Sequence, residues 1–228
     1  ILSRLFRVPV VIEVNGFLRG EEYILGLGRL KLMQLVIPLV ESLSFKYANK
    51  IVAVSTGIKQ ALQSTYKVPS EKIATIPNGA NVQLFSPMDQ AVVRKELGLQ
   101  GRDKIVCFAG YMAYWQGIKY LIEAAPLILK AVPNIKFLLV GDGPLKEELI
   151  MQASTLGLAN NFIFTGRVSY DVVPKYINAA DVCVAPFIQD RLASPMKIFE
   201  YLSCEKPVVT GNIEFVEELL KDSKSGIV

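Results

Sequence analysis

Lys197 and Glu200 lie three residues apart in a stretch, Ser194 to Thr210, that has the pattern of a loop, a helix and a strand. Ser194 is a typical helix N-cap residue, and Pro195 suits the first helical position. Residues three apart share a helix face, and the free N–H groups at a helix N-terminus attract anions. The pair is therefore either an ordinary surface ion pair or part of an anion-binding site.

The composition excludes several classes of chemistry. The chain of 228 residues contains no histidine, which rules out histidine triads, histidine metal ligands and histidine bases. Hydrophobic residues make up 51% and charged residues 20%, which excludes disorder and is typical of strands buried on both faces. The net charge of +4 is spread along the chain, so we expect no nucleic-acid partner.

Cysteine usage and hydropathy indicate a cytoplasmic protein. Cys107, Cys183 and Cys204 are far apart in apolar runs, as reduced core residues are. No signal peptide is recognisable, and the most apolar segment, Leu32 to Val40, is too short to cross a bilayer. The chain starts without methionine and ends where the pattern of a strand begins, so we expect an internal fragment.

The elements that must position Lys197 and Glu200 alternate between strands and helices. Strands are predicted at 8–14, 51–54, 73–76, 104–109, 135–140, 162–164, 181–185 and 207–209. Helices are predicted at 25–46, 57–66, 91–97, 118–131, 145–156, 172–179, 195–203 and 215–220. This alternation predicts an α/β fold with doubly wound parallel sheets.

Two features divide the chain. Apolar density falls between 80 and about 101, which indicates a boundary between two domains. Ahead of it, the helix at 25–46 is apolar on most faces, which favours a buried helix. Arg29 and Lys31 flank its apolar run, so an interfacial membrane helix is the alternative.

Four predicted loops meet at one edge of the second sheet. Ligands of doubly wound sheets bind outside the carboxyl ends of the strands, which here are followed by loops 110–117, 141–144, 166–168 and 186–194. Three of the loops begin with glycine, which lets backbone N–H groups approach a phosphate, although a plain turn would explain each glycine equally well. Neither the dinucleotide fingerprint nor a Walker A motif is present.

Several short sequence motifs follow one another in order along the chain. They are Val-Ala-Val-Ser at 52–55, Ile-Pro-Asn-Gly-Ala at 76–80, Trp-Gln-Gly-Ile-Lys at 115–119, Val-Gly-Asp-Gly-Pro at 140–144, Phe-Thr-Gly-Arg-Val at 164–168 and Ser-Pro-Met-Lys-Ile-Phe-Glu-Tyr-Leu at 194–202. Together they resemble the retaining glycosyltransferases of the GT-B fold, family 4, also called group 1. The resemblance covers residues 10–228.

The resemblance implies two Rossmann-like domains facing across a cleft. Residues 1–84 would be the C-terminal part of the acceptor domain, 85–101 a linker region, and 102–228 a donor domain truncated at its end. The implied reaction moves a hexose from a UDP- or GDP-sugar to a hydroxyl acceptor with retention, in polysaccharide, lipopolysaccharide or glycolipid biosynthesis. No metal or other cofactor is expected. The implied acceptor is a glycan or a lipid-linked sugar, met in the cytoplasm or peripherally on the inner face of the membrane.

The resemblance also assigns roles to residues. Glu200 matches the second glutamate of a paired motif and would hydrogen-bond the donor ribose, and Lys197 would lie by the diphosphate; these two are the predicted catalytic residues. The remaining predicted donor-binding residues are Gly110, Gln116, Gly141, Gly143, Arg167, Val168, Arg191, Ser194 and Met196.

The chain departs from the family pattern at four positions. Tyr111 and Gln116 stand where a phosphate-binding Arg and Lys are usual, Leu192 replaces the first glutamate, and Asn15 stands where many members have histidine. Lys197, Arg191 and the helix dipole remain as anion-binding groups.

The general base is left open between an acid such as Asp190 or Glu13 and no base at all. The alternative hypothesis is a catalytically impaired relative that binds a nucleotide or a partner. A nucleotide-sugar epimerase or a phosphorylase is disfavoured, since their acids, histidines and pyridoxal-lysine motif are missing.

Overall fold

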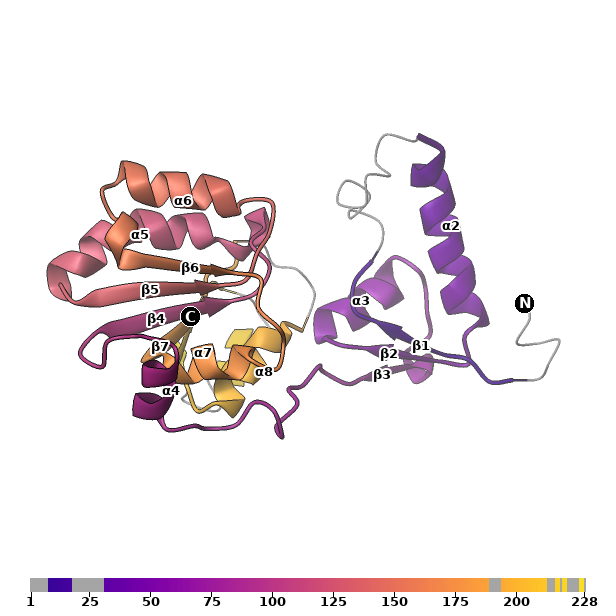
Figure 1. Ribbon diagram of the computed structural model, residues 1–228. Helices are drawn as coiled ribbons and strands as arrows, with labels where there is room; N and C mark the ends of the chain where they lie inside the picture. Colours follow the sequence, from indigo (N-terminus) through magenta and orange to yellow (C-terminus); the bar gives the residue numbers. More distant parts are fainter. Residues whose placement is uncertain are drawn as a thin grey trace. The chain divides into compact units, whose positions relative to one another are not determined.

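In a computed structural model the chain forms two compact α/β units (Figure 1). The first comprises Ile1–Asn78 with Arg191–Ser194, and the second Gly79–Asp190 with Pro195–Val228. The structure describes residues 8–17, 31–188, 194–212, 216–217, 219–220 and 226–227. All strand pairs within the described sheets are parallel, as the alternating pattern predicts.

The first unit holds a three-stranded sheet in the order β1-β2-β3. The strands are β1 (Val11–Val14), β2 (Lys50–Ala53) and β3 (Ile73–Thr75), and the helices are α2 (Lys31–Tyr47) and α3 (Thr56–Ser64). Ser55 caps α3, because its side chain accepts the backbone N–H of Ile58 at 3.1 Å. Apolar residues of the sheet and both helices form one core, which includes Phe45, Ile51, Ile58 and Leu62.

Helix α2 is buried on one side only. Phe45 and Ile37 face the core, whereas a run on the opposite side is between 37% and 59% exposed: Val36, Leu39, Val40 and Leu43. The sequence pattern favours a fully buried helix, and this is wrong for the described part, because one three-stranded sheet covers a single helix face. The predicted start at 25 lies outside the described residues. None of the helices in the described ranges has the length and hydrophobicity to cross a membrane.

The second unit holds a six-stranded sheet in the order β6-β5-β4-β7-β8-β9. The strands are β4 (Lys104–Ala109), β5 (Ile135–Val140), β6 (Phe162–Gly166), β7 (Val182–Ala185), β8 (Val208–Thr210) and β9 (Gly226–Ile227). Helices α5 (Ile118–Ala131) and α6 (Lys146–Thr155) cover one face, and α7 (Val173–Ala179) and α8 (Met196–Ser203) cover the other (Figure 1). The strand order reverses between β4 and β7, so a ligand crevice is expected at their carboxyl ends.

Each face of this sheet has its own core. Phe137, Leu139 and Ile122 are buried beneath α5 and α6, while Tyr201 and Ile198 are buried on the α7 and α8 side. Cys107, Cys183 and Cys204 lie in the second core as buried free thiols, as their apolar surroundings predict. The pKa of the Cys183 thiol is raised, first by burial and second by a hydrogen bond with Cys107.

The predicted linker, 85–101, lies inside the second unit. Phe85 is fully buried in the core beside Tyr201, and helix α4 (Gln90–Glu96) packs against α7. The low apolar density of this segment suggests a solvated connection, but burial of Phe85 and of the Arg94 side chain attaches it to the sheet. The two compact units divide at 78/79 instead.

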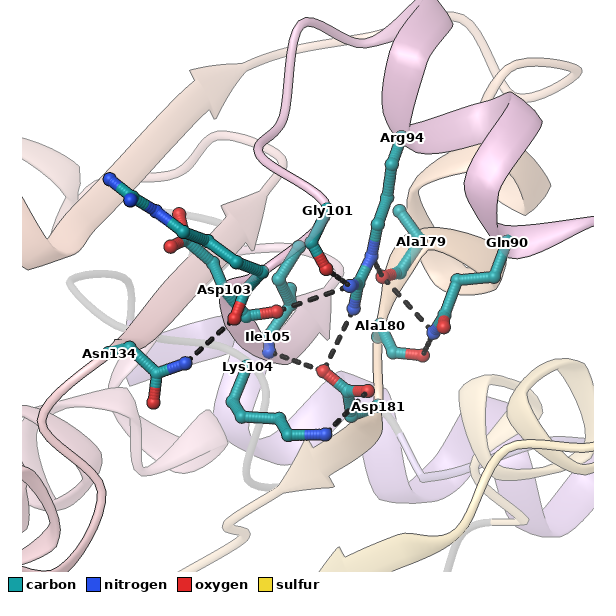
Figure 2. A network of polar contacts seen from close by, with 11 residues as sticks. Gln90, Arg94, Gly101, Asp103, Lys104, Ile105, Asn134, Ala179, Ala180 and Asp181 are labelled. Carbon is teal, nitrogen blue, oxygen red and sulfur yellow. Dashed lines mark hydrogen bonds and ion pairs between the residues drawn. The ribbon is translucent and has the colours of Figure 1, made fainter.

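Arg94 is the centre of a polar network at the amino-terminal edge of the sheet (Figure 2). Its Nε donates to the Ala179 carbonyl at 2.8 Å, and its Nη2 donates to Asp181 Oδ2 at 2.8 Å. Its Nη1 donates to the carbonyls of Gly101 and Asp103, each at 3.1 Å. The network joins α4 to the residues between α7 and β7, at the edge opposite the predicted ligand crevice.

Candidate functional site

A pocket of about 930 Å³ lies at the carboxyl ends of β4, β5 and β6. It is lined by residues 109–111, 140–144 and 167–170, together with Val173 and Glu200. Three of the four predicted loops therefore line one pocket within the second unit. Of the fourth, 186–194, residues 189–193 lie outside the described part of the chain.

Glycines let the pocket loops pack backbone against backbone. A Cβ on Gly141, whose φ is +128°, would lie 2.0 Å from the Gly110 carbonyl oxygen. A Cβ on Gly143 would lie 2.5 Å from the Met112 carbonyl oxygen. These glycines are therefore required by the close approach of two loops, and not by plain turns.

Tyr201 fixes helix α8 against the end of β4. Its side chain is fully buried, and its hydroxyl accepts the Ala109 N–H at 2.8 Å. Lys197 lies one turn earlier on the same helix, so its ammonium group lies next to the pocket loop that begins at Gly110. A Cβ on Gly110 would lie 2.6 Å from Lys197 Nζ. Glycine at 110 thus leaves room for the lysine.

Ser194 does not cap α8. The helix begins at Met196, and Pro195 is the N-cap residue without a side-chain cap bond, so the predicted cap is wrong by one residue. The Ser194 hydroxyl instead accepts the Asn78 N–H at 3.2 Å, and the Ser194 carbonyl accepts the Asn78 side-chain amide at 2.9 Å. These bonds join Ser194 to Asn78 within the first unit.

Lys197 has no counter-ion within hydrogen-bonding distance in the part of the chain that the structure describes. Its Nζ donates to Gln116 Oε1 at 2.6 Å and lies 3.9 Å from the centroid of the Phe108 ring. Within the described residues it forms no ion pair. Burial lowers the pKa of Lys197 to about 7, and the nearby Glu200 carboxylate offsets only part of that effect. A bound anion here would restore the charged form.

Glu200 is a buried carboxylate in the pocket wall, with 7% of its surface exposed. Its Oε1 accepts the hydroxyl of Tyr170 at 2.7 Å. Burial raises the pKa of Glu200, while the Tyr170 hydrogen bond and the Lys197 charge act in the opposite direction. Burial and the carboxylate together raise the pKa of Tyr170 to about 12.

The other predicted residues divide into three groups. Arg167 and Val168 line the pocket, and the exposed Arg167 has no ion-pair partner in the part of the chain that the structure describes. Met196 is 49% exposed and does not line the pocket. Arg191 and Leu192 lie outside the described residues. No group of metal-binding side chains is found in the described ranges.

Sequence reasoning missed Tyr170 as a pocket residue, although it placed the neighbouring loop 166–168 at the same edge. Tyr170 follows β6 of the parallel sheet, so its place at the carboxyl edge was available as a signal. Tyr111, noted in the sequence only as a departure from a pattern, also lines the pocket and is 56% exposed.

Comparisons with known proteins agree with this architecture. Residues 89–228 match the family model described as Glycosyl transferases group 1, and residues 1–84 match that described as Glycosyltransferase Family 4. An uncharacterized glycosyltransferase of Methanocaldococcus jannaschii is 29% identical over 82% of this chain and 48% of its own length. A GDP-mannose-dependent alpha-(1-6)-phosphatidylinositol monomannoside mannosyltransferase of Mycolicibacterium smegmatis is 30% identical over 79% of this chain and 49% of its own length.

Solved structures show the same fold. HepE of Anabaena, in complex with UDP and glucose, superposes with a TM-score of 0.77 at 24% identity, covering 99% of this chain and 59% of that protein. This likeness confirms the GT-B fold predicted from the motifs. The chain spans about half the length of the curated relatives described above, at 48% and 49%.

Proposed function

Because this chain belongs to the glycosyl transferases group 1 family, we propose that it forms the donor-binding part of a glycosyltransferase that moves a hexose from a UDP- or GDP-sugar to a hydroxyl acceptor with retention. The observation that carries this proposal is Lys197, a half-buried residue beside Gly110 of the pocket whose ammonium group has no ion-pair partner among the described residues. An isolated buried cation is unfavourable, and a diphosphate would neutralise it.

The chemistry assigns each group a task. Cleavage of the donor leaves negative charge on the departing diphosphate, and Lys197 with the N-terminus of α8 would stabilise that charge. Glu200 would accept hydrogen bonds from the ribose, and the loop at Arg167 and Val168 would contact the base. No metal or further cofactor is required, since the cation comes from the protein.

Lys197 partly compensates for the Arg and Lys that the family usually has at the positions of Tyr111 and Gln116. Gln116, which stands where a lysine is usual, accepts a hydrogen bond from Lys197 and so holds a lysine in place by its neutral amide. This arrangement supports an active enzyme. The second candidate is a nucleotide-binding module without turnover, and the observation favouring it is the leucine at 192, where a glutamate is usual.

Thermal unfolding in the presence of UDP and of GDP tests the donor site. We expect one of the two to raise Tm, since a ligand at about 100 times its Kd stabilises by about 2.7 kcal/mol. Uridine and guanosine serve as controls without the diphosphate. If neither nucleoside diphosphate raises Tm, the donor-site proposal fails; mass spectrometry of products from a panel of sugar donors then separates an enzyme from a binding module.

Donor affinity should depend on pH through Lys197. Because its pKa is about 7, the ammonium form is present below pH 7 and is lost above it. We expect the affinity for UDP-glucose or GDP-mannose, whose diphosphate diesters keep their charge, to fall about tenfold or more between about pH 6.5 and about pH 8.5. Calorimetric titration measures this fall, which should be absent in Lys197→Met. A fall of equal size in that variant would assign the effect to another group.

The acceptor is proposed to be a glycan or a lipid-linked sugar, met in the cytoplasm at the inner face of a membrane. The M. smegmatis relative is named for a phosphatidylinositol monomannoside acceptor, which supports a lipid-linked class. The exposed apolar side chains on one side of α2, which are Val36, Leu39, Val40 and Leu43, support peripheral contact with a lipid surface.

A further inference from the structure

Tyr170 connects the core of the second unit to the carboxylate in the pocket. Its hydroxyl donates to Glu200 Oε1 at 2.7 Å, and its ring packs on Phe85 with centroids 5.3 Å apart at 58°. Phe85 is fully buried, whereas Tyr170 is 51% exposed and lines the pocket. The Tyr170 ring is thus packed against the core, and the Tyr170 hydroxyl is hydrogen-bonded to Glu200.

The segment that follows Phe85 is hydrogen-bonded to α7. The buried side chain of Asn178 accepts the Met88 N–H at 2.9 Å and donates to the Ser86 carbonyl at 3.0 Å. These bonds attach the segment that follows Phe85 to α7, so the ring under Tyr170 has a fixed position. A residue held in this way loses little freedom when a ligand binds.

The hydrogen bond from Tyr170 gives the two oxygens of the Glu200 carboxylate different surroundings. Oε1 is taken by Tyr170, while Oε2 accepts no hydrogen bond from any residue that the structure describes. A carboxylate only accepts hydrogen bonds, so its free oxygen suits a ligand hydroxyl. Fixing Oε1 also fixes the direction in which Oε2 can accept.

We propose that Tyr170 is a positioning residue, which holds Glu200 so that the carboxylate accepts hydrogen bonds from the ribose hydroxyls and selects ribonucleoside diphosphates over their dideoxy counterparts. This inference rests on the proposed function, since it concerns the same pocket. Tyr170 acts through Glu200 and takes no part in bond making or breaking.

Calorimetric titration of Tyr170→Phe tests this. The variant keeps the ring on Phe85 and loses only the hydroxyl, so it should fold normally, with Tm lowered only by the loss of one hydrogen bond to Glu200. With UDP, or with GDP if that is the nucleotide bound, we expect about tenfold weaker binding. With the 2′,3′-dideoxy counterpart we expect less than about a twofold change, and in a Glu200→Gln background no further loss.

Tyr120→Phe on α5 is the matched control, because Tyr120 is likewise about half exposed, at 50%, but does not line the pocket. It should leave both affinities unchanged. Equal losses for the two ligands in Tyr170→Phe, or no loss for either, overturn the inference while the proposed function stands. If the unaltered protein binds neither UDP nor GDP, both fall together.

The acid limb of the pH profile gives a second readout. A hydrogen bond to the ionised carboxylate lowers its pKa, so loss of the Tyr170 hydroxyl should raise the pKa of Glu200 and move the acid loss of UDP binding to higher pH. Lys197 faces Glu200 from α8, and Arg167 and Asp142 line the same pocket; all three are unchanged in the variant. A profile lowered uniformly at every pH, with no shift, would indicate a merely structural role and overturn the inference.

Discussion

Replacing Lys197 with methionine is expected to reduce sugar transfer about 100- to 1000-fold. This range is typical for removal of one preorganised group that stabilises developing negative charge. Methionine is of similar length and fills the space between Phe108 and Gly110, so the loss should come from the charge and not from a cavity. Turnover of the best donor from the mass-spectrometric panel is the measurement.

Stability separates this effect from misfolding. Lys197 is half-buried without a counter-ion among the described residues, and removal of its ammonium group from water lowers its pKa, so its charged form is disfavoured in the folded state. The Tm of Lys197→Met should therefore be unchanged or higher near pH 7. Lys119→Met on α5, where the side chain is 55% exposed, is a matched control that should leave turnover unchanged. Unaltered turnover in Lys197→Met would contradict the assigned role.

Replacing Arg94 with methionine is expected to destabilise the second unit by about 3 to 5 kcal/mol. The substitution removes four hydrogen bonds and leaves the partly buried Asp181 carboxylate without its guanidinium partner. Asp181 keeps its bond from the Ile105 N–H at 2.7 Å, so its charge remains at the sheet edge (Figure 2). Urea unfolding followed by fluorescence measures the loss, since the single tryptophan, Trp115, belongs to the second unit.

Lys104→Met provides the comparison within the same network. The Lys104 ammonium lies 4.0 Å from the other oxygen of Asp181, but its side chain is 63% exposed, so we expect a loss of about 0.5 kcal/mol or less. Similar losses in both variants would show that the carbonyl contacts of Arg94 contribute little. Because Arg94 lies at the edge opposite the pocket, UDP affinity of the folded Arg94→Met protein should be unchanged.

The alternation of strands and helices was sufficient to predict the architecture. Runs such as Ile135 to Val140 are apolar throughout, as strands buried on both faces must be, and a parallel sheet brings their carboxyl ends to one edge. The loops after β4, β5 and β6 therefore had to meet, and this located the pocket from Gly110, Gly141 and Arg167. The order of strands and helices along the chain is therefore enough to predict where the pocket lies.

Side-chain partners distant in sequence required the tertiary structure. Gln116 and Lys197 are 81 residues apart, and Tyr170 and Glu200 are 30 apart, so no local pattern relates them. Burial of Phe85 and Arg94 likewise drew the predicted linker into the second unit.

Lys197 and Glu200 were recognised from the sequence as a pair that share a helix face. Their spacing alone favoured an ordinary surface ion pair and left an anion site as the alternative, because spacing does not determine burial. The tertiary structure separates their partners: the Lys197 ammonium bonds a neutral amide beside Gly110, and Glu200 accepts the phenol of Tyr170. The strength of the interaction between two charged groups depends on how far water is excluded and on which other charges are nearest. Tertiary packing decides both.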